Sequence, residues 1–153
     1  MLNIVLVEPE IPQNTGNIAR TCACTGTALH LVKPFKFEIS DKTVKRAGLD
    51  YWDKLNLTIY DSWQDFLQQN SSVPLYYIET TAKKNYAEIN YPINAFLVFG
   101  QETKGLKLEL IEQNPDTSVF IPMNGKVRSL NVSNAVAIVL YEALRQNNFV
   151  FYP

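Results

Sequence analysis

The chain has 153 residues, of which 46% are hydrophobic and 19% charged, and its formal net charge is −1. This length and composition predict one globular domain over residues 1–153, and no apolar run approaches the ~18 residues of a membrane span. A nearly neutral chain does not favour nucleic-acid binding, which usually goes with a basic balance, although a local basic patch is compatible with it.

Short apolar runs alternate with helical patterns along the chain. The predicted strands are Leu2–Val7, Leu29–Val32, Thr58–Tyr60, Leu75–Glu79, Ala95–Phe99 and Ser118–Ile121. Five helices are predicted: Asn14–Thr25, a second that ends at Ala47, a third that ends at about Gln69, Leu106–Gln113, and a long helix from about Val132. The candidate N-caps are Asn14 or Thr15 for the first helix, Ser40 or Asp41 for the second, Asp61 or Ser62 for the third, and Asn131 or Ser133 for the last. This alternation predicts an α/β fold with a mostly parallel sheet.

The last helix is apolar on two sides. Its first stripe consists of Val132, Ala135, Val136, Val139, Leu140, Ala143 and Leu144, and its second consists of Ala137, Ile138 and Tyr141. A surface helix of a small domain normally has one apolar stripe and a polar back. The second stripe therefore predicts contact with a partner subunit.

Ligands of open α/β sheets bind beyond the carboxyl ends of the strands. That rule selects the segments Glu8–Gly16, Glu79–Lys84, Gly100–Gly105 and Pro122–Asn131. Neither the G-x-G-x-x-G nor the P-loop pattern is present, so the usual dinucleotide and nucleotide-phosphate sites are not supported. The loop Thr80–Asn94 is the longest stretch without periodicity, which suggests a functional or mobile segment.

The first of three motifs is EPEIPQNTGNIAR, Glu8–Arg20. Backbone N–H groups at a helix start and the guanidinium of Arg20 would together suit an anion, such as an RNA phosphate or a developing alkoxide. The alternative is structural: Asn14 caps the helix, Gly16 allows close packing, and Arg20 is a solvated surface charge.

The second motif is FGQETKGL, Phe99–Leu106, in which Gly100 would let a ligand approach the backbone. Glu102 has no carboxylate partner nearby in sequence, so a paired-carboxylate hydrolase is not indicated. An ordinary turn between a strand and a helix with a charged face is the alternative.

The third motif, Ile121–Asn134, gathers short polar side chains at a helix entrance, for which redundant capping is the alternative.

His30 is the only histidine and is interpreted as structural. No cluster of metal ligands is evident, so no metal is predicted. Cys22 and Cys24 point to different faces of one helix and are expected to be free thiols. With no signal peptide at the N-terminus, these thiols predict a cytoplasmic protein.

Basic residues are mildly enriched between Lys33 and Lys54, with Tyr51 and Trp52 among them. A solvated helix face and an RNA-binding surface both fit this pattern.

Together the motifs resemble the SpoU branch of the SPOUT superfamily of RNA methyltransferases. The matching patterns are N-x-G-x-x-x-R at Asn14–Arg20, F-G-x-E-x-x-G at Phe99–Gly105, and I-P-M at Ile121 followed by R-S-L-N-V-S-N-A-V at Arg128–Val136. The opening motif and AGLDYW at Ala47–Trp52 resemble one subgroup, the tRNA wobble-nucleotide 2′-O-methyltransferases. The likeness runs from Met1 to about Gln146, and the short chain lacks any added RNA-binding domain.

This resemblance implies a C-terminal trefoil knot, a homodimer, and S-adenosylmethionine bound in the knot loops. The substrate would be the anticodon stem-loop of tRNA, in leucine tRNAs, at the cytidine or modified uridine of position 34. The cofactor would contact Ile78, Gly100, Ile121 and Ser129, with Thr80 and Leu130 nearby, largely through backbone groups. No metal or membrane partner is implied.

Methyl transfer from a sulfonium to a ribose hydroxyl depends mainly on positioning and on stabilisation of the developing oxyanion. Arg20 is the candidate for that stabilisation, with Asn14 and Asn131 holding the loops and Glu102 orienting Arg20 or nearby backbone. A guanidinium stays protonated, so a phosphate or a water would accept the proton. The alternatives are a non-catalytic RNA-binding module, a small-molecule methyltransferase, and a 2′-O-methyltransferase acting at another RNA position.

Overall fold

The computed structural model describes residues 1–37 and 54–150. Its sheet consists of β1 (Asn3–Val7), β2 (Ala28–Val32), β3 (Leu57–Tyr60), β4 (Leu75–Ile78), β5 (Lys84–Asn85), β6 (Phe96–Phe99) and β7 (Ser118–Phe120). The helices are α1 (Pro12–Thr25), α3 (Trp63–Gln69), α4 (Leu108–Gln113) and α5 (Val132–Gln146), with a 3-10 turn, η2 (Tyr86–Glu88). Every ladder between these strands is parallel, which confirms the predicted α/β fold with a mostly parallel sheet.

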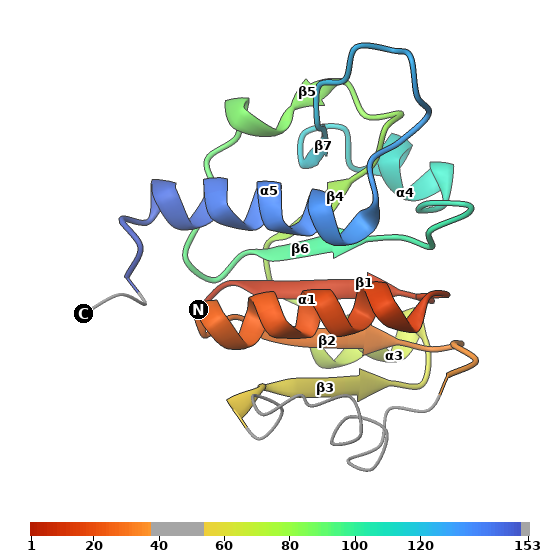
Figure 1. The fold of residues 1–153 in the computed structure, drawn as a ribbon, viewed down its shortest axis with the longest axis vertical. Coiled ribbons are helices and arrows are strands. Elements are labelled where there is room, and N and C mark those ends of the chain that lie inside the picture. The colour runs from red at the N-terminus through yellow and green to blue at the C-terminus, as the bar shows by residue number, and fades with distance from the viewer. Residues whose placement is uncertain (38–53, 151–153) are drawn as a thin grey trace.

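The strand order is β3-β2-β1-β6-β4-β7-β5. On the central strand β1, Ile4 lies opposite Leu29 of β2 and Leu97 of β6. Because all strands run in one direction, their carboxyl ends meet at a single edge of the sheet (Figure 1). The chain therefore brings the segments after β1, β4, β6 and β7 to that edge.

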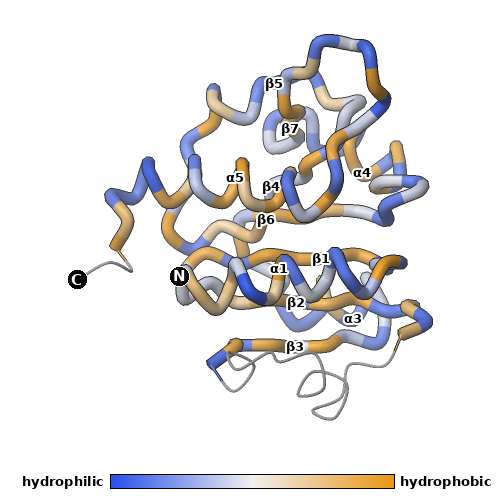
Figure 2. Tube along the Cα trace, viewed as in Figure 1, coloured by the Kyte–Doolittle hydropathy of each residue, from blue (hydrophilic) through white to orange (hydrophobic). Residues whose placement is uncertain are grey.

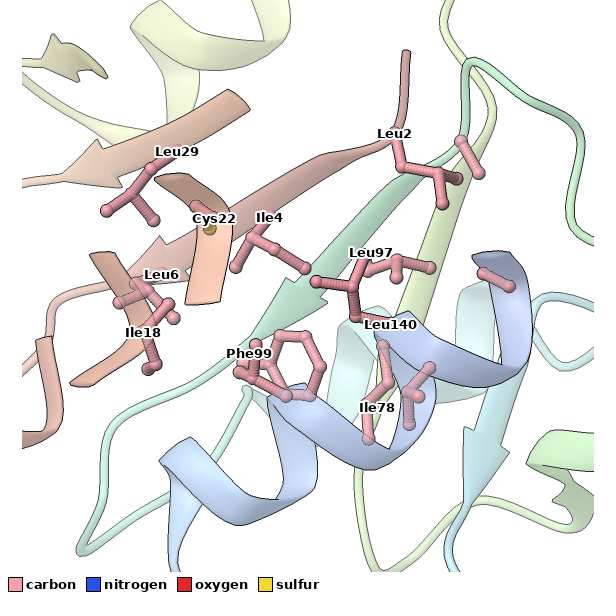
Figure 3. Close-up of a cluster of buried hydrophobic side chains, with 14 of the residues drawn as sticks. Leu2, Ile4, Leu6, Ile18, Cys22, Leu29, Ile78, Leu97, Phe99 and Leu140 are labelled. Atoms are coloured by element: carbon pink, nitrogen blue, oxygen red, sulfur yellow. The ribbon is translucent and has the colours of Figure 1, made fainter. Parts of the chain in front are cut away.

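Helices cover both faces of the sheet: α1 and α5 lie on one, and α3 and α4 on the other (Figure 1). In Figure 3, Ile18 and Cys22 of α1 and Leu140 of α5 point toward the sheet residues between them. Figure 2 shows β1 and β6 as hydrophobic along their length. Such unbroken apolar strands are expected where a parallel sheet is buried on both faces.

The first helix begins earlier than the sequence predicted. It starts at Pro12, with Ile11 at the N-cap and no side-chain cap. Proline is favourable at the first helical position because its missing N–H has no partner there anyway. The prediction that Asn14 or Thr15 caps this helix was therefore wrong: both are buried inside the helix, and the amide of Asn14 is used elsewhere.

Most other predicted elements are confirmed to within a few residues. The side chain of Ser62 caps α3, and that of Asn131 caps α5. The segment predicted as an irregular loop from Thr80 to Asn94 contains β5, which pairs with β7, and the turn η2. The predicted helix from Ser40 or Asp41 to Ala47 lies outside the described residues.

The two sides of α5 have different surroundings. Val136, Val139, Leu140, Ala143 and Leu144, which belong to the first predicted stripe, are buried. The second stripe is not buried within the chain: Tyr141 is 48% exposed, and Ala137 and Ile138 are half-buried. Within the described residues, this second stripe is therefore only partly covered.

Both cysteines are free thiols. Cys22 is buried, and burial raises the pKa of its thiol to about 12, whereas Cys24 is exposed. Across residues 1–37 and 54–150, the helices are too short or too polar to cross a membrane.

His30 is a core residue of β2, as predicted. Its ring nitrogens lie 3.0 Å from the Tyr60 hydroxyl and 3.2 Å from Oδ1 of Asn3, and the ring packs against Phe96. Burial lowers the pKa of the imidazole to about 4, so the ring is neutral at pH 7.

We expect His30 to make the fold acid-sensitive. Below pH ~6.5 the imidazole of the unfolded chain binds a proton, whereas the buried ring of the folded chain stays neutral down to a pH of about 4. The contribution of His30 to the stability of the folded state is therefore complete above pH ~6.5 and is lost as the pH falls toward 4. The loss amounts to up to about 3 kcal/mol of unfolding free energy. Denaturant titrations of wild type and His30→Phe between pH 7 and pH 4.5 test this. Equal pH slopes for the two proteins would contradict it.

Candidate functional site

A cavity of about 760 Å³ lies at the carboxyl edge of the sheet. Its wall is built by the segments that follow β4, β6 and β7, together with the start of α1. The cavity is lined by all the residues predicted to hold a cofactor, namely Ile78, Thr80, Gly100, Ile121, Ser129 and Leu130. Cofactor sites in proteins commonly have volumes of roughly 300–1,000 Å³.

Asn14, Glu102 and Asn131 also line this cavity, and they contact one another. Nδ2 of Asn14 donates to Oε1 of Glu102 at 3.1 Å, and Nδ2 of Asn131 donates to Oδ1 of Asn14 at 3.0 Å. Oδ1 of Asn131 accepts the backbone N–H of Ser133 and so begins α5. This hydrogen-bonded chain joins the three motifs of the sequence, each from a different part of the polypeptide.

Glu102 orients backbone. Its carboxylate accepts the N–H groups of Glu10 at 2.8 Å and Ile11 at 3.1 Å, in addition to the amide of Asn14. These donors lie just before and within the first turn of α1, where backbone N–H groups have no partner inside the helix. Glu102 thus fixes the entrance of α1 against the turn after β6.

Further contacts join the same two segments. Nε2 of Gln101 donates to the carboxylate of Glu8, and the hydroxyl and backbone N–H of Thr103 donate to Glu10. The hydrogen bonds from Thr103 are the main reason that the pKa of Glu10 lies below its usual value. The segment after β1 and the turn after β6 are therefore held together at three successive residues of the turn.

The structure gives a further reason for the glycine at position 100, in addition to the ligand approach that was predicted. A Cβ built on it would lie 2.1 Å from the carbonyl carbon of Gly105 and 2.3 Å from the backbone nitrogen of Leu106. The turn 101–105 folds back onto Gly100 and closes with a short bridge between Gln101 and Gly105. The missing side chain makes room for the chain's own backbone, rather than for a ligand alone.

Glu79 is a structural residue of the site that the sequence did not single out. Its carboxylate accepts the N–H of Leu106 at 2.8 Å and that of Thr80 at 2.7 Å. A Cβ on Gly105, which has φ +68°, would strike this carboxylate. The carboxyl-end rule does select the segment that begins at Glu79, but only the contact with a distant turn reveals its role.

Arg20 is the one predicted site residue that does not line the cavity. It lies on α1 between the buried Ala19 and the half-buried Thr21, and its side chain is exposed. Gly16 belongs to the same motif, and a Cβ added to it would meet nothing within 4 Å. The described residues therefore give no support to the close packing suggested as the structural role of Gly16.

Three further lining residues are cationic and were not predicted: Lys104, Lys107 and Arg128. All three are exposed. Within residues 1–37 and 54–150, no group of three or more metal-ligating side chains is gathered in one place.

Comparison with known proteins places these features in context. Residues 1–141 match the model of the SpoU rRNA Methylase family. A tRNA (cytidine(34)-2′-O)-methyltransferase of Saccharophagus degradans is 45% identical over 97% of this chain and 97% of its own length. A solved structure concerned with the 2-OH methylation of C/U34 on tRNA has a TM-score of 0.89 and 41% identity, and 97% of each chain is covered.

A third relative was solved with a ligand. It is an AdoMet-bound rRNA methyltransferase from Sinorhizobium meliloti, with a TM-score of 0.81 and 26% identity over 94% of this chain and 56% of that one.

Proposed function

Because the chain belongs to the SpoU rRNA Methylase family, we propose that it methylates the ribose 2′-hydroxyl of nucleotide 34 in tRNA, with S-adenosylmethionine as methyl donor. The observation that carries this proposal is the cavity, where Asn14, Glu102 and Asn131 meet the predicted cofactor residues. The likeness to named relatives covers nearly the whole chain, which supports the same activity.

The lining fits S-adenosylmethionine. Gly100, Ser129 and Leu130 line the cavity, and peptide N–H and C=O groups at such positions could hydrogen-bond the edge of an adenine. Apolar side chains of Ile78 and Ile121 line the same space. When bound, the cofactor would supply an activated methyl group on its sulfonium.

The chain's own residues would position the acceptor. Asn14, Glu102 and Asn131 hold the segments around the cavity in fixed positions, and we propose that Arg20 stabilises negative charge on the 2′-oxygen. Arg20 does not line the cavity of its own chain, but its helix packs beside α5. We infer that Arg20 acts in a site completed across a dimer interface along α5.

The activity is tested by incubating the protein with labelled S-adenosylmethionine and tRNA and mapping the modified nucleotide by mass spectrometry. We expect a single 2′-O-methyl group at position 34, and we propose that leucine tRNAs are the substrates. Methylation at another position, or of ribosomal RNA instead, would overturn the assignment. A non-catalytic RNA-binding module would bind tRNA without taking up cofactor, and a small-molecule enzyme would methylate free nucleosides.

We propose that the single domain suffices for this activity and recognises the anticodon stem-loop. A stem-loop RNA should then be methylated about as well as the full tRNA. We also propose that the protein works in the cytoplasm, where its tRNA substrate occurs, which cell fractionation would test.

We propose a homodimer in which the second apolar stripe of α5 is covered by another copy. Placing a charge there, as in Ile138→Glu or Tyr141→Glu, should split the dimer or unfold the chain, because the carboxylate would be buried without a partner. Light scattering at micromolar concentration measures the mass. Ile93→Glu is the control, since Ile93 is similarly exposed at 39% but lies outside α5. A folded wild-type monomer would contradict the proposal.

We also propose that the C-terminal part is threaded as a trefoil knot. Support comes from the strand order, in which β7 lies beyond β4 while α5 returns to pack on β6 and α1. Stretching single molecules from both ends tests this. A knotted chain should extend less than the ~3.3–3.6 Å per residue of a fully extended one.

A further inference from the structure

Three exposed cations, Lys104, Lys107 and Arg128, line the cavity of a chain whose net charge is −1. Lys104 and Lys107 come from the segment between β6 and α4, and Arg128 comes from the loop between β7 and α5, which also carries Lys126 two residues earlier. The side chains of all four are exposed. The salt bridges found among residues 1–37 and 54–150 involve other cations.

Among the described residues, neither carboxylate that lines the cavity forms a salt bridge with these cations. Both are turned to backbone N–H groups: Glu79 to Leu106 and Thr80, and Glu102 to the entrance of α1. Glu10 interacts electrostatically with Lys104, but its carboxylate also accepts hydrogen bonds from Thr103. The two lining carboxylates therefore hold the backbone of the cavity wall.

These cations come from two separate segments. The turn after β6 and the loop between β7 and α5 are distinct excursions at the carboxyl edge of the sheet in Figure 1. Figure 2 shows hydrophilic residues along the outer part of that loop. The two pairs thus belong to different segments at this edge of the sheet.

A ribose presented to this cavity would bring phosphates to its mouth. The 2′-oxygen is attached to the ring carbon next to the one that carries the 3′ phosphate, and the 5′ phosphate follows on the other side of the sugar. When the hydroxyl enters the cavity, these two phosphates stay outside, where lysine and arginine would meet them. Such phosphate contacts supply much of the affinity and fix the register of a nucleic acid.

Aromatic stacking is a weak alternative as the main anchor. Of the residues 1–37 and 54–150 that line the cavity, Phe99 is the only aromatic one, and it is 2% exposed. Proteins that hold single-stranded RNA by its bases normally present accessible aromatic rings. The described part of this site therefore offers charge rather than rings.

We propose that Lys104 with Lys107, and Lys126 with Arg128, form a clamp that holds the two phosphates flanking the target ribose. This inference rests on the proposed methylation of tRNA. It identifies the residues that set the position of the 2′-hydroxyl relative to the cavity.

The test uses two double variants, Lys104→Gln with Lys107→Gln, and Lys126→Gln with Arg128→Gln. Binding of an anticodon stem-loop RNA is measured over a range of salt concentrations. Each lost phosphate contact should reduce the salt dependence, the slope of log K against log salt, by ~0.7. Affinity at low salt should fall by about 10-fold or more, because each contact is a charge-assisted hydrogen bond. Affinity for S-adenosylmethionine, measured by calorimetry, should not change.

Arg145→Gln is the control. Arg145 is exposed and lies in the last turn of α5, at the end of the helix away from the cavity (Figure 1), so its loss should leave the salt slope unchanged. If both double variants kept the wild-type slope, or if Arg145→Gln lowered it equally, the clamp would be refuted.

A neutral phosphate analogue locates the contact. A stem-loop carrying a methylphosphonate on one side of the target nucleotide should bind wild type more weakly. The same substitution should have no further effect on the double variant whose pair contacts that phosphate. Additive losses in every combination would overturn the assignment of pairs to phosphates.

If wild type itself failed to methylate tRNA, the proposed function would fail, whereas active enzyme with unaffected variants would refute the clamp alone.

Discussion

Replacing Arg20 with alanine is expected to slow methyl transfer by ~10²–10³-fold while leaving affinity for S-adenosylmethionine unchanged. The reason is that a preorganised donor aimed at a developing oxyanion acts in the transition state and does little for the bound ground state. Arg20→Lys should restore activity only in part, because an ammonium cannot reproduce the planar fork of a guanidinium. Single-turnover assays with saturating tRNA measure the rate.

The contrary outcome is equally clear. A solvated surface arginine would give both variants rates within a few-fold of wild type. Mixed dimers give a second test: if Arg20 acts across the dimer interface, Arg20→Ala chains mixed with chains that cannot bind cofactor should regain activity. No recovery would place Arg20 in the site of its own chain.

Replacing Gly100 with valine is expected to have the second large effect, and even Gly100→Ala should lower both stability and cofactor affinity. Any Cβ at this position meets the backbone of Gly105 and Leu106 at 2.1–2.4 Å, so the turn 101–105 must move. Overpacking of this kind costs about 1–3 kcal/mol or more. We expect a lower melting temperature and a loss of S-adenosylmethionine affinity on the order of 100-fold, because the displaced turn forms the cavity wall.

Gly16→Ala is the matched control, since it adds the same methyl group where nothing lies within 4 Å. An alanine inside a helix should raise stability by roughly 0.5–1 kcal/mol. Calorimetry and thermal melts of both variants give the comparison. If Gly100→Ala melted and bound cofactor like wild type, the steric role of Gly100 would be wrong.

Much of this fold could be predicted because the strands are short, apolar and separated by helical patterns. The error at α1 had a simple cause. Asn14 is the first strong capping residue of that segment, but its amide is taken up by Glu102, and the helix begins at Pro12 without a side-chain cap. Strand β5, Lys84–Asn85, has no apolar pattern and exists only because β7 lies beside it.

The residues of the site could likewise be predicted only in part. A glycine after a strand indicates a close approach, and the sequence cannot say whether a ligand or the chain's own backbone makes it. For Gly100 the answer depends on how the turn after it folds back. Glu79 gave no signal either, since its role arises from the N–H of Leu106, which is 27 residues away.

The hydrogen-bonded chain from Glu102 through Asn14 to Asn131 has a consequence for synthesis. Asn131 is 117 residues beyond Asn14, so the last wall of the cavity leaves the ribosome after all seven strands of the sheet. Contacts of such long separation close late, because the loop entropy must be overcome first. A nascent chain that ends before Ile121 lacks part of the wall and all of α5, and so has no complete cavity in which to bind cofactor. A nascent chain should therefore begin to bind S-adenosylmethionine only after synthesis has passed Ala135, the last residue that lines the cavity.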